Sequence, residues 1–273
     1  MIERLQDLLV VSDMDNTLLT ARGGLPACNA AAIQLFCAMG GRFTVATGRP
    51  PESIQAALGG LRLSTPVVAC GGAVLYDLER GKALSTSHLP RVSAEAAIQD
   101  VLGEFPEVGV EVMVGAGEVY VVKANRYTQA HLRDERLHCV VAPLEEIPDG
   151  WAKVVFAGDS GLLAKIQAFA LRRSYSGAYF LSTNSIYFEL MPQGVSKATG
   201  MAQLCERLGI SMNNTIFIGD YYNDLELMRA AGHSVAVANA PLDVQAQADE
   251  VTWGRCVDGG VGEYLYRLCK EYT

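Results

Sequence analysis

The sequence predicts an α/β protein whose parallel sheet is interrupted by an inserted α+β unit. In the first 70 residues, three short apolar runs alternate with two amphipathic stretches. Strands buried on both faces are apolar at consecutive positions, and helical crossovers between such strands produce a parallel sheet. After residue 196 the same alternation returns, whereas the intervening segment has the rhythm of hairpins and helices.

In the first segment, each apolar run is expected to be a buried strand: 8–11, 43–46 and 66–69. The stretch 29–39 carries apolar side chains at helical spacing and stops at two glycines. The stretch 50–58 begins with two prolines and stops at two further glycines, which predicts a short second helix.

The middle segment is predicted to form an α+β unit with an antiparallel sheet. Its expected strands are 73–77, 82–87, 108–114, 118–123, 137–141, 153–157, 178–182 and 186–191. Its expected helices are 93–105, 127–136 and 161–173. In the last segment, the expected elements are helices 196–209 and 224–231, strands 215–218 and 234–238, and a final helix through Val261, Leu265 and Leu268. The predicted division is a core from residues 1–83 and 190–273, with an inserted α+β domain at 84–189.

The composition and net charge of the chain argue against some classes of binding partner. The chain has 273 residues, 50% hydrophobic and 19% charged, with a net charge of −8, so it is globular and lacks a general attraction for nucleic acid or anionic membranes. No transmembrane or signal segment is visible, and seven cysteines without a Cys-x-x-Cys pair indicate reduced thiols in a cytoplasmic protein. The sequence does not indicate an oligomeric state.

Polar side chains follow several predicted strands of the core. Asp13 and Asp15 come after the first strand, and Asp220 and Asp224 come after the strand 215–218. Thr47 and Arg49 follow the second strand, and Lys197 opens the helix at 196. Ligands of open parallel sheets bind at the carboxyl ends of the strands. Four carboxylates against two cations at one edge predict a hard dication, Mg²⁺, which would let the edge accept a phosphoryl group.

Each of these residues alone has a simpler interpretation. An Asp after a strand is more often a turn former or helix cap than a catalyst, and Thr47-Gly48-Arg49 or Lys197 alone has an ordinary structural reading. The functional interpretation therefore depends on their combination at successive strand ends.

Four segments in order carry a family resemblance: 13–19 (Asp-Met-Asp-Asn-Thr-Leu-Leu), 46–49, 194–197 and 219–224. They resemble the motifs of the haloacid dehalogenase-like (HAD) phosphohydrolases, and among these the Cof-type group with a type IIB cap. The resemblance covers nearly the whole chain. It implies a HAD-like Rossmannoid core with a parallel sheet and helices on both faces, plus an inserted α+β cap domain with an antiparallel sheet.

The resemblance also implies roles. Asp13 would be the nucleophile that forms an aspartyl-phosphate, and Asp15 would be the general acid and then the base. Mg²⁺ would bind Asp13, the Asp15 backbone carbonyl and Asp220, with support from Asp224. The implied catalytic set is Asp13, Asp15, Thr47 and Lys197. Phosphate or substrate contacts are implied for Met14 (through its backbone), Thr47, Gly48, Arg49, Lys197 and Asn223.

Two positions depart from the family pattern. Asn16 stands where the family usually has Gly, and Asn tolerates the left-handed backbone that such a turn requires. Gly71 stands where Cof-type chains commonly have Asn, which removes an amide near the site. In the cap, Asn125-Arg126-Tyr127, Asn184, Tyr187 and Glu189 are candidates to face the cleft, although a surface or packing role is the commoner one for each.

Three functions follow as hypotheses. The first is a Mg²⁺-dependent phosphomonoester hydrolase for small phosphorylated metabolites, with sugar phosphates as the expected substrates. The second is a phosphotransferase or phosphosugar mutase on the same fold, because related mutases share this cap. The third is a catalytically idle ligand-binding or regulatory protein, against which the presence of all four motif carboxylates and Lys197 argues.

Overall fold

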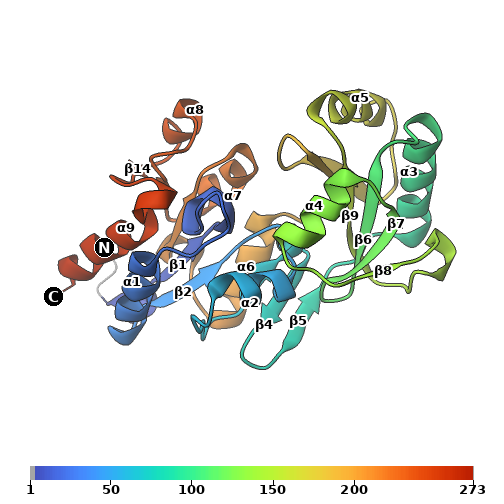
Figure 1. Ribbon diagram of the computed structural model, residues 1–273. Helices are drawn as coiled ribbons and strands as arrows, with labels where there is room; N and C mark the ends of the chain where they lie inside the picture. Colours follow the sequence, from blue (N-terminus) through green and yellow to red (C-terminus); the bar gives the residue numbers. More distant parts are fainter. Residues whose placement is uncertain (1–3, 273) are drawn as a thin grey trace.

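A computed structural model describes residues 4–272 of the chain, in which two large sheets and a small one are surrounded by helices (Figure 1). The core sheet has five strands that all run parallel. Its strands, in spatial order, are β14 (Glu250–Val251), β13 (His233–Ala236), β12 (Thr215–Gly219), β1 (Leu9–Ser12) and β2 (Arg42–Val45). This arrangement confirms the predicted parallel core.

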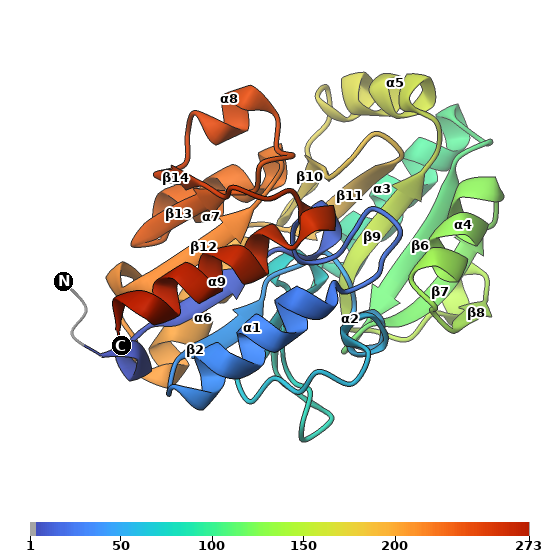
Figure 2. The same cartoon turned by 60° about the vertical axis from the view of Figure 1, so that its left-hand side comes forward.

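Helices cover both faces of the core sheet, as the sequence predicted. Val10 of β1 packs in the cluster that contains residues of α1 (Ala27–Ala38) and α9 (Gly260–Glu271), which lie side by side in Figure 2. Leu9 and Val11 point the other way and join a second cluster. That cluster includes residues of α6 (Lys197–Leu208), α7 (Leu225–Ala230) and the short α8 (Leu242–Gln245). Because side chains alternate along a strand, the wholly apolar run of β1 serves both faces.

The third apolar run does not extend the core sheet as expected. β3 (Val67–Ala69) meets the end of β2 through one parallel bridge, between Ala46 and Val68. It then forms a small antiparallel sheet with β4 (Val74–Asp77) and β5 (Lys82–Thr86). The two strands diverge after this bridge because β2 ends just before the turn at Thr47. Parallel pairing therefore stops there. The helix between them is α2 (Pro51–Leu58).

The cap consists of a six-stranded sheet and the helices α3 (Arg91–Glu104), α4 (Arg126–Asp134) and α5 (Ser160–Ala170). Its strands, in spatial order, are β10 (Ala178–Ser182), β11 (Tyr187–Pro192), β9 (Trp151–Ala157), β6 (Gly109–Val114), β7 (Glu118–Lys123) and β8 (Cys139–Val141). All its pairs are antiparallel except β7 with β8, which is parallel. The exception arises because α4 carries the chain back before β8 begins. The predicted antiparallel cap sheet is thus confirmed, with β8 as a parallel strand at its edge.

The two faces of the cap sheet have different neighbours. Phe188 and Leu190 of β11 pack with residues of α3 and α5, whereas Met191 joins a cluster of core residues. Tyr187 and Glu189 share the face of Met191, since side chains alternate along a strand. This face therefore looks toward the core. β5 runs across the predicted domain boundary at 83/84, and β11 runs across the one at 189/190. Both boundaries remain predictions.

The short α8 and β14 were not expected from the sequence. Within residues 4–272, no helix has both the length and the apolar character needed to cross a membrane.

Gly72 allows the first turn of α6 to approach the end of β3. Its φ is +103°, and a Cβ there would lie 2.0 Å from the carbonyl oxygen of Ser196. Gly200, one turn into α6, also lies close to β3, because a Cβ there would lie 2.7 Å from a methyl group of Val68. The close contact fixes the start of α6, where Lys197 lies.

We expect Gly72→Ala to lower the free energy of unfolding by about 2–4 kcal/mol, since it adds a steric clash with backbone to the cost of the left-handed conformation. The matched control is Gly81→Ala. Gly81 has a φ of +62° but nothing within 4 Å of a built Cβ. This control carries the conformational cost alone, about 1–2 kcal/mol. Urea unfolding measures both variants, and equal losses would contradict the close-contact explanation.

Candidate active site

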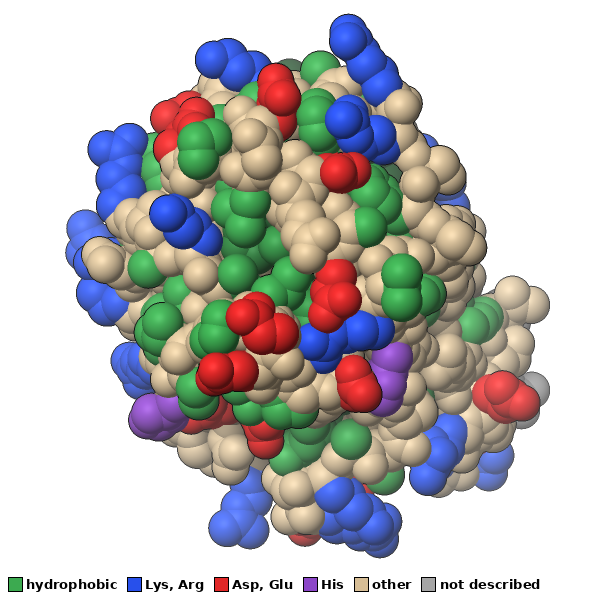
Figure 3. All heavy atoms as spheres, turned by 90° about the vertical axis from the view of Figure 1, so that its right-hand side faces the viewer, with side chains coloured by type: hydrophobic (Ala, Val, Ile, Leu, Met, Phe, Trp, Pro, Cys, Tyr) green, Lys and Arg blue, Asp and Glu red, His purple; other side chains and the backbone are tan. Residues whose placement is uncertain are grey.

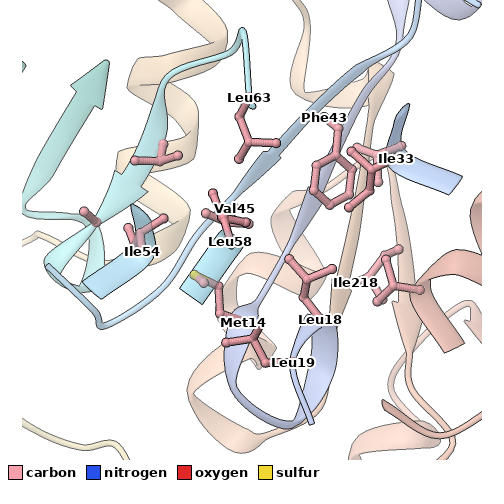
Figure 4. Packing of buried hydrophobic residues seen from close by; sticks show 14 of the residues in the cluster. Met14, Leu18, Leu19, Ile33, Phe43, Val45, Ile54, Leu58, Leu63 and Ile218 are labelled. Carbon is pink, nitrogen blue, oxygen red and sulfur yellow. The ribbon is translucent and has the colours of Figure 1, made fainter. Parts of the chain in front are cut away.

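The turn after β1 presents the first two carboxylates. The Asp13 N–H donates to the carbonyl oxygen of Ile218 on β12 at 2.8 Å, which ties this residue to the sheet. The Leu19 N–H donates to the Met14 carbonyl at 2.8 Å and closes a turn over residues 14–18, in which Asn16 has a φ of +58°, the left-handed conformation expected at that position. Met14 and Leu18 are fully buried and anchor the turn in the core (Figure 4), while Asp15 and Asn16 are exposed. Only the backbone of Met14 is therefore available to a ligand.

Lys197 joins two of the motif carboxylates. Its Nζ donates to Asp13 Oδ1 at 2.5 Å and to Asp224 Oδ1 at 2.8 Å, and all three side chains are buried. Ser196 caps the N-terminus of α6 and sets the position of the lysine. Burial opposes the charge of Lys197, but Asp13 and Asp224 raise the pKa of its ammonium above the ordinary value. The lysine is thus a fixed cation among the carboxylates.

Asp220 and Asp224 are held by the turn that follows β12. The backbone N–H groups of Asp220 and Tyr221 donate to Asp224 Oδ2 at 3.0 and 3.3 Å. Thr17 Oγ1 donates to Asp220 Oδ1 at 2.7 Å, so the turn after β1 also orients this carboxylate. Both aspartates are buried. Their orientation is therefore set by hydrogen bonds within the core.

Oxygens of Asp13, Asp220 and Asp224 all lie within 4.8 Å of one another. Burial raises the pKa of Asp13 well above its ordinary value, and Asp224 and Asp220 add to this effect against the opposing charge of Lys197. Burial and Asp224 raise the pKa of Asp220 to about 7. Three buried carboxylates with one ammonium lack positive charge, and an all-oxygen ligand set suits a hard dication. The residues present therefore fit Mg²⁺.

Arg49 binds Asp15 with two parallel hydrogen bonds. Its Nε and Nη2 donate to Asp15 Oδ2 and Oδ1 at 2.9 and 2.6 Å, and its Nη1 donates to Ser53 Oγ at 2.7 Å. The arginine is buried, whereas half of the Asp15 side chain is exposed. The phosphate contact expected for Arg49 stays a prediction, and in this structure its guanidinium binds Asp15 and Ser53.

The remaining predicted residues lie around the same edge. Thr47 is buried, and its Oγ1 accepts the Arg49 N–H at 3.2 Å. Asn223 is half-buried, and the Gly48 carbonyl accepts a hydrogen bond from Lys153 of the cap at 2.9 Å. The core thus brings all the predicted polar side chains to one place.

A cavity of about 720 Å³ lies between this edge and the cap. Of the predicted site residues, it is lined by Asp13, Asp15, Thr47, Gly48, Arg49, Lys197, Asp220 and Asn223, but not by Met14 or Asp224. Among the cap candidates, Asn184, Tyr187 and Glu189 line it as well. Asn125 instead caps the N-terminus of α4. Arg126 and Tyr127 are not part of the lining either.

The sequence analysis missed several charged groups on the cap side of the cavity. Lys153 Nζ also donates to Glu189 Oε1 at 2.6 Å, and both side chains are buried. His131 lies between two carboxylates: its Nδ1 is 2.6 Å from Glu111 Oε2 and its Nε2 is 3.3 Å from Glu135 Oε1. Burial opposes its charge, but these two partners raise the pKa of His131 to about 10. Lys153 could have been recognised as a candidate because it is the one charged residue within an otherwise apolar predicted strand.

The family model for haloacid dehalogenase-like hydrolases matches residues 10–265. The chain belongs to this family. The family resemblance found in the sequence is therefore confirmed, and this HAD-like hydrolase is an enzyme. Its curated relatives are named phosphatases, which confirms the predicted enzyme class at the level of the family.

Similar proteins extend over almost the whole HAD-like chain. An HMP-PP phosphatase of Serratia proteamaculans is 27% identical over 260 residues, covering 94% of this chain and 93% of that protein. The pyridoxal phosphate phosphatase YbhA of Escherichia coli is 27% identical over 267 residues, with coverages of 94% and 97%. The crystal structure of a haloacid dehalogenase-like hydrolase from Bacteroides thetaiotaomicron has a TM-score of 0.86 at 25% identity, with coverages of 96% and 99%.

A sugar phosphatase of HAD subclass IIB shares the fold, with a TM-score of 0.81 at 20% identity, and coverages of 96% of this chain and 99% of that one. These likenesses confirm the predicted architecture of a HAD-like core and an inserted α+β cap.

We expect the metal-free protein to lose stability as the pH rises from about 4 to about 7. The Asp220 carboxyl keeps its proton to about pH 7 in the folded state, whereas an unfolded Asp releases it near pH 3.9. The unfolded state thus loses protons first over this interval, which favours unfolding. Urea unfolding in chelator should show a shallower fall for Asp220→Asn. Parallel pH profiles for the two proteins would contradict this assignment.

Proposed function

We propose that the protein is a Mg²⁺-dependent phosphomonoester hydrolase that acts on small phosphorylated metabolites through an aspartyl-phosphate on Asp13. The observation that carries this proposal is the buried group of three carboxylates around a single ammonium. Two of them, Asp13 and Asp224, share Lys197 directly. Such a group requires further positive charge, and with it becomes a receptor for a phosphoryl group.

Asp13 is the proposed nucleophile because it lines the cavity and its position is doubly fixed. Its backbone is bonded to β12 and its Oδ1 to Lys197. The lysine holds one oxygen in place and favours the ionised carboxylate, which attacks phosphorus through an oxygen lone pair. Asp13, Asp220 and the Asp15 backbone carbonyl would hold Mg²⁺ with support from Asp224, and the bound ion would supply positive charge that offsets the phosphoryl oxygens.

Asp15 is the proposed acid and base. It lines the cavity two residues after Asp13 and is the most exposed of the four motif carboxylates. The protonated carboxyl would give its proton to the leaving oxygen, and the carboxylate would then take a proton from the attacking water. Arg49 donates to both oxygens in this structure, which is the arrangement of the ionised carboxylate that would act as the base. The acid step would require one of these two hydrogen bonds to open. Thr47 and Asn223 are proposed to donate to phosphoryl oxygens, which their place in the cavity lining supports.

The proposed substrates are small because the cavity is closed on one side by the cap. Its volume of about 720 Å³ suits a metabolite rather than a polymer. Relatives named for HMP-PP and pyridoxal phosphate support small phosphorylated substrates, and sugar phosphates remain within the proposed range. At the cap end of the molecule, acidic and basic side chains are interspersed (Figure 3). That face offers no uniformly basic surface for nucleic acid.

We also propose a cytoplasmic location, which the buried thiols of Cys70, Cys205 and Cys256 support.

We expect Asp13→Asn to lower kcat for a generic phosphomonoester by at least about a thousandfold, because an amide is no nucleophile. The variant should stay folded, since it relieves repulsion among buried carboxylates. Asp100→Asn, which changes an exposed carboxylate bonded to Tyr175 on the cap, is the matched control. Phosphate release and circular dichroism measure the outcome. Persistent turnover would overturn the nucleophile assignment, and isomerised sugar phosphate without free phosphate would indicate a mutase.

We expect a chelator to abolish phosphate release and Mg²⁺ to restore it. Asp224→Asn should weaken the apparent affinity for Mg²⁺ by about 10–100-fold, because Asp224 orients the site through Lys197 and two backbone N–H groups. Titration of Mg²⁺ by activity and by the shift in Tm measures the affinity twice. A chelator-treated enzyme that keeps its full rate would refute the metal.

A further inference from the structure

The turn after β1 is tied to the C-terminal part of the chain by two asparagine side chains. Asn239, which follows β13, donates from Nδ2 to the Asn16 carbonyl at 2.8 Å, and its Oδ1 accepts the Cys256 N–H at 2.7 Å. A backbone N–H can only donate and a carbonyl can only accept, so the amide has one orientation that satisfies both partners. The position therefore needs a side chain with both a donor and an acceptor.

Asn29 on α1 forms the same kind of bridge to the other end of the turn. Its Nδ2 donates to the Leu18 carbonyl at 2.8 Å, and its Oδ1 accepts the Gly262 N–H of α9 at 2.7 Å. Asn29 is fully buried, whereas Asn239 is half-buried. The two bridges have the same hydrogen-bonding chemistry, and they differ in which residue of the turn they hold.

The residue held by Asn239 has the backbone conformation on which the turn depends. The φ and ψ angles are −74° and 125° at Asp15, and 58° and 9° at Asn16, which are those of a type II turn. Its second central position requires a left-handed residue, for which Asn is less favourable than Gly. The competing type I turn has no left-handed residue and differs by a flip of the peptide between residues 15 and 16. That flip would reverse the direction of the Asp15 carbonyl.

The backbone at Asp15 has a support that does not depend on Arg49. Arg49 binds the Asp15 side chain in this structure, but the proposed acid step would open one of these hydrogen bonds. The neighbouring carbonyl, that of Asn16, stays bonded to Asn239. Asn239 is therefore placed to hold the turn while the Asp15 side chain changes its partners.

We propose that Asn239 is a positioning residue, which keeps the turn in its type II conformation and thereby orients the backbone carbonyl and the side chain of Asp15. This inference rests on the proposed function, because the Asp15 carbonyl is an expected ligand of Mg²⁺. Asn239 does not line the cavity, so it acts through Asn16. Asn29 instead holds Leu18, whose side chain packs in the core (Figure 4), and its bridge is structural.

The test compares Asn239→Ala with Asn29→Ala. Asn239→Ala should weaken the binding of Mg²⁺ by about tenfold or more, since loss of a group that orients a metal ligand typically costs about 10–100-fold. Asn29→Ala should lower Tm further than Asn239→Ala does, because its hydrogen bonds are buried. It should nevertheless leave the affinity for Mg²⁺ close to that of the wild type. Calorimetric titration of the metal-free protein and the rise of Tm with Mg²⁺ both measure this affinity without turnover.

Asn125→Ala is the second control, which serves if Asn29→Ala does not fold. The Asn125 amide also bridges backbone groups: its Nδ2 donates to the Ala157 carbonyl at 2.8 Å, and its Oδ1 accepts the Tyr127 N–H at 2.9 Å. Asn125 belongs to the cap and does not line the cavity. Its substitution should lower Tm without a change in the affinity for Mg²⁺.

A second substitution separates positioning from general support. Asn16→Gly introduces the residue that adopts the left-handed conformation at the least cost. In the Asn239→Ala background it should restore most of the lost affinity for Mg²⁺. Because Asn16→Gly adds no hydrogen bond, a loss of affinity that came only from weakened structure would persist.

The inference and the proposed function have separate outcomes. If the wild-type protein releases no phosphate from any phosphomonoester, the proposed function is wrong, and the Mg²⁺ affinities still test Asn239. If the wild-type protein binds no Mg²⁺, hydrogen exchange of the Leu19 amide, which closes the turn, tests Asn239 in the metal-free protein. Asn239→Ala should then speed this exchange several-fold and Asn125→Ala should not, and equal exchange rates would overturn the inference.

Three results in a protein that binds Mg²⁺ would also overturn it. The first is an affinity of Asn239→Ala equal to that of the wild type. The second is an equal loss of affinity in Asn29→Ala or Asn125→Ala. The third is a loss that Asn16→Gly leaves unchanged.

Discussion

The ammonium of Lys197 between Asp13 and Asp224 is the interaction on which the site depends. Three buried carboxylates would repel one another without it, and removal of one partner from a buried ion pair typically costs about 3–5 kcal/mol. The fold delivers its members from distant parts of the chain: Asp13 from the end of β1, Asp224 from the turn after β12, and Lys197 from the start of α6. Even the backbone serves this contact, since Gly72 lets α6 approach closely enough for Lys197 to reach.

Much of this arrangement could be predicted from sequence because it depends on local patterns. Buried parallel strands are apolar at consecutive residues, so β1, β2 and β12 were evident, and the residues after them had to meet at one edge. Pairing between segments was harder. β3 is as apolar as β2, and nothing in its sequence shows that it turns away after one bridge. The parallel pairing of β8 depends on where α4 returns the chain, and α8 and β14 are too short to leave a periodic pattern.

The same distinction between local patterns and contacts of distant segments applies to the site. The identity of its carboxylates followed from motif spacing, whereas the partner of each side chain depends on distances between segments. Arg49 illustrates this: its sequence position predicts a phosphate contact, which stays a prediction, but does not predict its hydrogen bonds to Asp15 and Ser53. The pairing of Lys153 with Glu189 could not be predicted for the same reason, because it depends on the distance between side chains of two different cap strands.

Lys153 compensates buried negative charge at the boundary between cap and core, as Lys197 does within the core. Lys197 compensates carboxylates within the core, and Lys153 compensates Glu189 of the cap while its Nζ also donates to Gly48, between Thr47 and Arg49. The loop that positions Thr47 and Arg49 is thus bonded to the cap strand β9 that faces it. Because Lys153 is buried, its charge is satisfied only while both acceptors are in reach. Lys153 therefore joins the cap wall of the cavity directly to the loop that carries Thr47 and Arg49.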